Sequence, residues 1–126
     1  MTRTIIRAEG VAPAPAIYSH AVMAAGLVFV SGTGPYHPDT GTVVGETIQD
    51  QTDQALRNIA RILESAGSSL EKAVSATVIL ADEDDFAGLN EAWLKWFPVD
   101  PPARQAAKLP VRIPGLRVSI AMIAEA

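Results

Sequence analysis

The sequence predicts an α+β protein, a two-layer sandwich in which two helices cover one face of a six-stranded mixed sheet. Two segments repeat apolar residues at three- and four-residue steps, which is typical of amphipathic helices. An apolar, β-branched segment typical of a buried strand separates them. Strand-like runs precede the first helix and follow the second, so the expected order is β-ββ-α-β-α-ββ. The 126 residues have the length of one domain, spanning 1–126.

The N-terminal third predicts three short strands. Residues 4–8, TIIRA, form the first, and the proline–alanine stretch 11–20 after it favours an extended path without sheet donors. Gly26 is placed to make a hairpin turn, with Val22–Ala24 and Leu27–Ser31 as its two arms.

The first helix begins at Thr47, because Asp50 follows three residues later in a capping-box-like pair. Gly67 is placed to end it in the left-handed conformation. Residues 73–81, AVSATVILA, then form a strand buried on both faces or nearly so. The apolar face of the helix comprises Ile48, Thr52, Ala55, Ile59, Ile62, Leu63 and Ala66.

The second helix begins at Asp82 and Asp85 and ends at Pro98. Strands are expected over residues 104–109 and 116–124. The second sheet face is largely apolar, so we expect it to dock against another subunit. The buried helix face comprises Phe86, Leu89, Asn90, Trp93, Trp96 and Phe97, whereas in the last strand Val118, Ile120 and Met122 alternate with Ser119, Ala121 and Ile123.

The composition of the chain argues against several classes of function. The net charge of −4 argues against a nucleic-acid partner, which requires a concentrated positive surface. No cysteine is present, which excludes disulfides, thiolate zinc sites and cysteine nucleophiles. The two histidines, His20 and His37, stand in predicted loops without metal-binding partners, so no metal site is expected. Without a signal-peptide core or an apolar segment of ~20 residues, we expect a soluble cytoplasmic protein with no membrane partner.

Arg104 is the strongest candidate for a functional side chain. It follows Pro101 and Pro102, which would stiffen the turn before it. Its planar guanidinium matches a carboxylate in a bidentate pair. The alternative is an arginine in a surface salt bridge.

Three further positions are candidates for ligand binding. Tyr18 follows a proline-rich loop and could form a pocket wall, or anchor the loop at its rim. Ser31 and Gly32 end an apolar strand, where small residues let a ligand approach the backbone or simply form a turn. Asn90 lies on an apolar helix face, where its amide needs a partner in a ligand or a neighbouring loop.

Taken together, these segments resemble the Rid family, the YjgF-like reactive intermediate deaminases. The similarity runs from about Ile17 to Ala124. It rests on YSHAV, GLVFVSGTGP, PDTG, QTDQALRNIARILESAGSSLEKAV, DFAGLNEAWLKWF and PPAR in the family's order.

The resemblance implies a chorismate-mutase-like α+β fold, a homotrimer with ligand pockets between subunits and an activity that needs no cofactor. Such enzymes hydrolyse enamines and imines, for example 2-aminoacrylate, to 2-keto acids and ammonia. The family's carboxylate-binding arginine corresponds to Arg104, and its pocket tyrosine, serine and asparagine correspond to Tyr18, Ser31 and Asn90.

Two positions depart from the family pattern. Ala106 stands where the archetype has a cysteine, although its backbone carbonyl could still hold a water. Ser119 stands where the archetype has the water-positioning glutamate. A serine can hydrogen-bond a water but provides no anionic acceptor, and loss of a general base typically costs ~10²–10⁴ in rate.

Three interpretations follow. The first is an imine or enamine deaminase of altered preference, with His20 as a candidate proton-transfer group. The second is a catalytically weak protein that binds small carboxylates as a sensor or regulator. The third is an interaction protein, for which the sequence contains no direct indication. The family's older label, endoribonuclease, is disfavoured by the acidic charge balance. We favour the first interpretation, with Arg104 and Ser119 as its catalytic residues.

Overall fold

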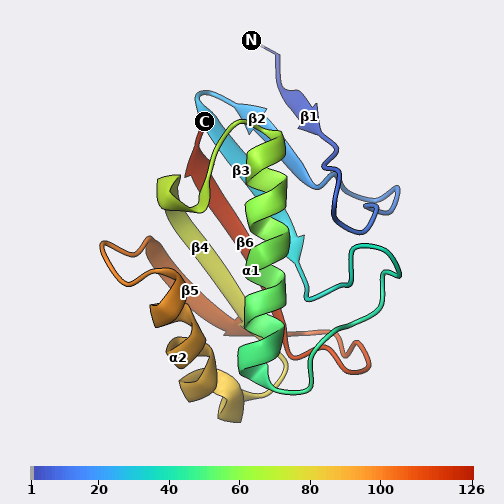
Figure 1. Cartoon of the computed structure of the whole chain (residues 1–126), viewed down its shortest axis with the longest axis vertical. Coiled ribbons are helices and arrows are strands. Elements are labelled where there is room, and N and C mark those ends of the chain that lie inside the picture. The colour runs from blue at the N-terminus through green and yellow to red at the C-terminus, as the bar shows by residue number, and fades with distance from the viewer. Residues whose placement is uncertain (1) are drawn as a thin grey trace.

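The computed structural model describes residues 2–126, and their strands form one mixed sheet in the spatial order β1-β2-β3-β6-β4-β5 (Figure 1). Only β4 and β5 pair in parallel; the other neighbours are antiparallel. The prediction of a six-stranded mixed sheet is therefore confirmed. The strands are β1 (Thr4–Ile6), β2 (Ala21–Ala24), β3 (Leu27–Thr33), β4 (Ala73–Leu80), β5 (Ala103–Lys108) and β6 (Val118–Glu125).

Two helices, α1 (Ile48–Ser65) and α2 (Phe86–Trp96), lie side by side on one face of this sheet (Figure 1). The predicted cap of α1 is present, since the Thr47 hydroxyl accepts a hydrogen bond from the Asp50 N–H over 3.1 Å. Gly67 has a φ of 79°, the left-handed conformation expected after a helix. Short 3₁₀ turns, η1 (Leu70–Lys72) and η2 (Glu83–Asp85), precede β4 and α2.

The hydrophobic core fills the space between the helices and the sheet. Along strand β6, buried and partly exposed side chains alternate. The even-numbered residues from Val118 to Ala124 are buried, and the residues between them are partly exposed. The opposite side of the sheet, here called the open face, has no helix over it (Figure 1). Phe29 on this face is 41% exposed. The open face therefore leaves an apolar surface for another contact.

The β2–β3 hairpin turns at Ala25 and Gly26, both with positive φ, as a two-residue loop requires. At the other end of β3 the register with β6 shifts between Val30 and Thr33. This irregularity contains Ser31 and Gly32, so the predicted site residues lie where the sheet pairing is interrupted.

Several element boundaries differ from the sequence-based prediction. Strand β5 ends at Lys108 and β6 begins only at Val118, because Pro110 and Pro114 in the intervening loop cannot donate ladder hydrogen bonds. At the second helix, Asp82 caps the turn η2 by accepting from the Asp84 N–H over 2.8 Å. Helix α2 itself begins at Phe86.

Candidate functional site

The open face carries a cavity of about 440 Å³, here called the Ser119 pocket. It brings together four residues predicted from separate segments: Tyr18, Ser31, Gly32 and Ser119. Its full lining comprises Tyr18, Ser31, Gly32, Gly34, Tyr36, Leu109, Ile113, Leu116 and Ser119.

Ser31 connects the end of β3 to the loop that carries Tyr18. Its N–H donates to the His20 carbonyl over 3.0 Å, and its hydroxyl donates to the Ser19 carbonyl over 2.5 Å. The neighbouring Gly32 lies against Ser119, since a Cβ at Gly32 would come within 3.1 Å of the Ser119 Oγ. The absence of a side chain at Gly32 thus leaves room beside the serine hydroxyl.

Two buried amides of α1 fix the walls of the Ser119 pocket. Asn58 donates to the carbonyls of Gly34 and Tyr36 over 3.1 and 2.9 Å. Gln51 donates to the Gly115 carbonyl over 2.8 Å and accepts from the Arg117 N–H over 2.8 Å. Because both amides are nearly inaccessible to solvent, these bonds rigidly place the loops on either side of the pocket.

His20 has a structural role in this arrangement. Its Nδ1 accepts from the Ala8 N–H over 3.0 Å, and its Nε2 lies 2.8 Å from the Ala12 carbonyl, to which it donates in the matching neutral tautomer. Both ring nitrogens are therefore occupied by backbone groups. This geometry speaks against the hypothesis that His20 transfers a proton during the reaction.

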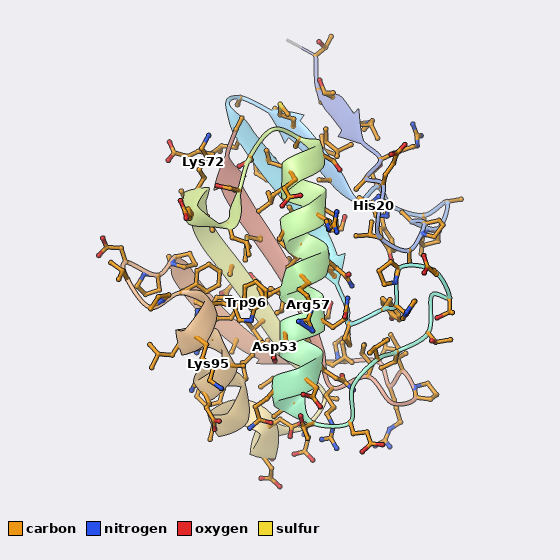
Figure 2. The ribbon with its side chains drawn as sticks, viewed as in Figure 1. His20, Asp53, Arg57, Lys72, Lys95 and Trp96 are labelled. Atoms are coloured by element: carbon orange, nitrogen blue, oxygen red, sulfur yellow. The ribbon has the colours of Figure 1, made fainter. Side chains whose placement is uncertain are left out.

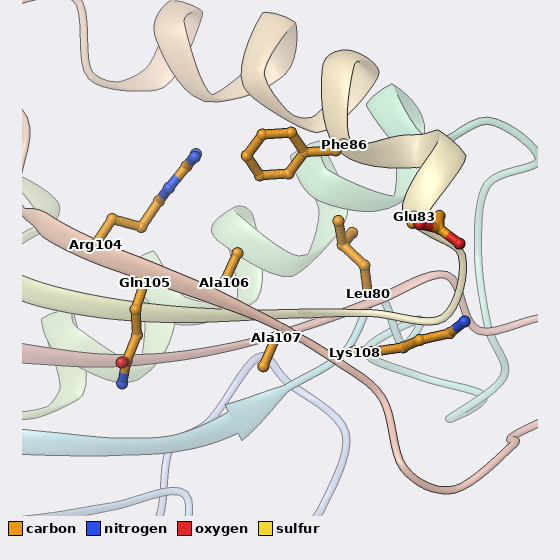
Figure 3. Close-up of a pocket in the computed structure, with 8 residues that line it drawn as sticks. All are labelled: Leu80, Glu83, Phe86, Arg104, Gln105, Ala106, Ala107 and Lys108. Carbon is orange, nitrogen blue, oxygen red and sulfur yellow. The ribbon is translucent and has the colours of Figure 1, made fainter.

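Arg104 lies in a different cavity of about 580 Å³, here called the Arg104 cleft, which also contains Ala106 (Figure 3). The guanidinium carbon is 5.7 Å from the ring centre of Phe86 and 5.3 Å from that of Trp93. It forms no ion pair within residues 2–126, so the salt-bridge alternative is not realised there. The guanidinium is held by aromatic rings of α2 and keeps its charge unpaired.

Within one chain, Arg104 and Ser119 lie on opposite faces of the sheet. Arg104 pairs with Ala76, whose side chain is buried beneath the helices. Ser119 pairs with Ile79 on the open face. Figure 3 shows Arg104 on the Phe86 side of β5 and Gln105 pointing the other way. One chain therefore contains two separate parts of the predicted site.

Asn90 lies on the α2 face that carries Phe86 and Trp93, because residues three and four apart share a helix face. Its Oδ1 is buried and has no hydrogen-bond partner among the described residues. The structure thus places an unpaired acceptor on the side of α2 that contacts Arg104, although Asn90 lines neither cavity described above.

Within residues 2–126, no three His, Asp or Glu side chains gather where they could hold a metal ion. The helices of this part of the chain are also too short or too polar to cross a membrane.

Tyr36 was not predicted from the sequence, yet it lines the Ser119 pocket beside Tyr18. Burial, and secondarily the nearby Tyr18, raise the pKa of Tyr36 above its usual value of 10.0. An available signal was its position in SGTGPY, five residues after the candidate Ser31.

The raised pKa of Tyr36 predicts alkaline sensitivity. The unfolded chain releases this proton near pH 10, before the folded protein does. Stability should therefore be retained below pH 10 and lost as the pH rises through the raised pKa. Urea unfolding between pH 8 and 11.5 measures this, and Tyr36→Phe should show a shallower decline. Equal slopes for the two proteins would contradict the prediction.

Comparisons with known proteins agree on one family. The family model described as Endoribonuclease L-PSP matches residues 9–126. The chain is 35% identical over 127 residues to a 2-iminobutanoate/2-iminopropanoate deaminase of Capra hircus, covering 98% of this chain and 93% of the relative. It is 39% identical over 112 residues to Reactive Intermediate Deaminase A, chloroplastic, of Arabidopsis thaliana, covering 86% of this chain but only 60% of that longer protein.

Solved structures show the same fold. A Rid-family protein from Yersinia pestis, YyfA, has a TM-score of 0.92 and 29% identity, covering 99% of this chain and 100% of its own. E. coli TdcF, solved with bound serine, has a TM-score of 0.88 and 28% identity, covering 98% of both chains. The motifs, the fold and the family match over residues 9–126 lead to one conclusion: this chain belongs to the Rid (YjgF-like) family, which the Endoribonuclease L-PSP model describes.

Proposed function

We propose that this protein hydrolyses small enamine and imine carboxylates, of the 2-aminoacrylate type, to 2-keto acids and ammonia without a metal. The observation that carries the proposal is the unpaired guanidinium of Arg104, held between Phe86 and Trp93 in an accessible cleft. The deaminase names of two relatives support an enzyme. The serine bound to TdcF supports a small-molecule ligand.

Arg104 would bind the substrate carboxylate. A guanidinium remains charged at all physiological pH values and donates two parallel hydrogen bonds to a carboxylate. The two aromatic rings restrict its rotation, so little ordering remains to be done on binding. Asn90 lies on the same side of α2, but its buried Oδ1 lines neither cavity, so we assign it no contact with the substrate.

The Ser119 pocket would hold the reacting carbon and a water. An enamine first tautomerises to the imine, as carbon 3 gains a proton and nitrogen loses one. Water then adds to the C=N carbon, the π electrons move to nitrogen, and a proton from the water follows them. The resulting carbinolamine expels ammonia and leaves the 2-keto acid. Ser119 would hydrogen-bond the water, with the Ala106 carbonyl as a second acceptor from the cleft. Tyr18, Ser31 and Gly32 would enclose the substrate.

These roles require two copies of the chain. Arg104 and Ser119 point to opposite sides of one sheet, so a single chain cannot grip a small molecule with both. We propose a homotrimer in which the Arg104 cleft of one subunit meets the Ser119 pocket of the next. The open face, with Phe29 exposed, supports such an assembly. A cytoplasmic location stays a prediction, because named relatives include chloroplastic and mitochondrial proteins.

A second candidate function is binding without turnover. The Ser119 pocket contains no acidic side chain among its lining residues. A site with a carboxylate-binding arginine but no acidic side chain in the Ser119 pocket would suit a sensor of small 2-keto acids.

A trapping assay separates the two functions. An amino-acid oxidase or dehydratase generates the imine, and semicarbazide captures what remains free in solution. The deaminase interpretation requires the wild-type protein to lower the amount of semicarbazone relative to buffer. If it does not, while calorimetry detects pyruvate binding, the sensor interpretation replaces it.

Mixed assembly tests the shared site. Arg104→Ala and Tyr18→Ala subunits, each defective in a different half, are co-refolded at equal amounts. Random mixing of a shared site restores about a quarter of the intact sites. Activity no higher than that of the separate variants would place the whole site within one chain. Light scattering of the wild-type protein measures the trimer mass directly.

A further inference from the structure

The Ser119 pocket is lined by a hydroxyl-bearing residue, Tyr36, that the family resemblance did not indicate. We propose that the Tyr36 hydroxyl contacts the reacting atoms in this pocket and works with Ser119 in moving a proton from the attacking water to the imine nitrogen. This inference rests on the proposed function and names a further catalytic residue for it.

The backbone of Tyr36 is fixed from two sides. Its carbonyl accepts a hydrogen bond of 2.9 Å from the buried Asn58 of α1. Tyr36 also forms an isolated antiparallel bridge with Val43. A loop residue is thereby attached to α1 and to a neighbouring segment, as a residue that must keep a defined position requires.

Gly34 makes room for the Tyr36 ring. A Cβ at Gly34 would lie 2.7 Å from the Cε2 atom of Tyr36, closer than such atoms can approach, and 3.2 Å from Leu116. The ring therefore rests directly on the backbone of residue 34 and lines the pocket that contains Ser119. The segment GTGPY therefore contains both Gly34, which leaves the space, and Tyr36, whose ring occupies it.

The chemistry of the pocket explains why a phenol is useful there. None of the residues that line the Ser119 pocket is acidic, so the pocket itself supplies no carboxylate to accept a proton from water. A neutral hydroxyl donates and accepts at once. Burial and the neighbouring Tyr18 raise the pKa of Tyr36, so its O–H stays protonated through the neutral range.

The step is balanced without a charged base. As the water oxygen bonds to the imine carbon, the C=N π electrons pass to nitrogen. The Tyr36 oxygen gives its proton to that nitrogen and takes one from the water, directly or through the Ser119 hydroxyl. The products are the neutral carbinolamine and an unchanged phenol, so Tyr36 is ready for the next turnover.

The test is Tyr36→Phe, which keeps the ring on Gly34 and removes only the oxygen. We expect kcat for 2-iminobutanoate to fall by about 100-fold, the range of a lost proton-transfer group, with KM nearly unchanged. Urea unfolding at pH 7.5 checks that stability is preserved. A wild-type kcat in this variant would overturn the inference while leaving the deaminase function intact.

A rescue experiment separates proton transfer from a structural role. Ser119→Glu introduces the carboxylate that the pocket lacks. If Tyr36 moves a proton, Tyr36→Phe should cost much less in the Ser119→Glu protein, and the pH profile of kcat should gain an acidic limb from the new carboxylate. An equal loss in both backgrounds would show that Tyr36 is merely structural.

Binding gives an independent readout if the wild-type protein does not turn over imines. Such a result would overturn the proposed function. The carbonyl oxygen of 2-oxobutanoate then takes the place of the imine nitrogen, and calorimetry compares its affinity for wild type and Tyr36→Phe. Affinity lower by about threefold to tenfold in the variant supports contact with the ligand. Equal affinities would overturn the inference itself.

Discussion

Replacing Arg104 by alanine is expected to lower kcat/KM for small imine carboxylates by about 100-fold, the effect of losing a charge-assisted bidentate pair. Most of the loss should appear in KM, because the guanidinium binds the substrate carboxylate in the ground state and the transition state alike. The semicarbazide assay at varied imine concentration separates the two constants. The fold should be unaffected, since Arg104 lies on the edge strand β5 and forms no ion pair within residues 2–126.

Two control variants sharpen this result. Arg104→Lys keeps the charge but loses the planar fork and the stacking geometry, so it should recover only part of the activity. Arg57→Ala removes an exposed arginine of α1 and should leave kcat/KM unchanged (Figure 2). If Arg104→Ala retained wild-type KM and kcat, the carboxylate would bind elsewhere and the proposed function would lose its main support.

Replacing Gln51 by leucine is expected to lower the free energy of unfolding by about 3 kcal/mol, since each lost hydrogen bond is worth ~1 kcal/mol. The buried amide donates to the carbonyls of Gly45 and Gly115 and accepts from the Arg117 N–H. Leucine is similar in volume but leaves all three backbone groups without their partner. Thermal unfolding should shift down by about 10 °C for a chain of this size.

Gln49→Leu is the matched control for this variant. Gln49 lies two residues earlier on α1, is only partly buried, and its side chain forms no hydrogen bond among the described residues. A change within about 0.5 kcal/mol is expected there. If Gln51→Leu were equally mild, water would be replacing the lost bonds and α1 would not fix the loop that reaches Ser119.

Much of the fold was predictable because it depends on local chemistry. The cap at Thr47, the left-handed Gly67 and the hairpin turn at Gly26 all follow from interactions within a few residues. The alternation of buried and open residues along β6 follows from strand geometry alone. The strand ends near Pro110 and Pro114 were harder to predict. A proline lacks the N–H donor, and this matters to a strand only where a neighbouring strand would accept that hydrogen bond.

The candidate site was predictable only in part. Four residues of the Ser119 pocket were predicted, Tyr18, Ser31 and Gly32 from local features and Ser119 from the family pattern. The structure brings these four to one cavity. Arg104 was predicted to be a carboxylate-binding side chain held by the adjacent prolines, and within residues 2–126 it forms no ion pair. In the folded chain the rings of Phe86 and Trp93 flank it.

The roles of His20 and Tyr36 depend on hydrogen bonds to residues of other segments. Near Tyr18 in the sequence, His20 looked like a proton-transfer group, yet its nitrogens bind the backbone of Ala8 and Ala12. Tyr36 was not singled out in the sequence, yet Asn58 holds its backbone, Gly34 leaves room for its ring, and it lines the Ser119 pocket. The roles of both depend on partners that folding supplies, which no local pattern contains.

The sequence by itself determined the elements of this protein, the face that each buries and its family, because periodicity, capping and motif order are local properties of a chain. Only the tertiary structure decided which functional side chains lie on each side of the sheet. Pairing of β5 with β4 turns Arg104 toward α2, and pairing of β6 with β4 turns Ser119 toward the open face. The physical reason is that side chains alternate across a strand, so register alone sets which side of the sheet each functional group faces.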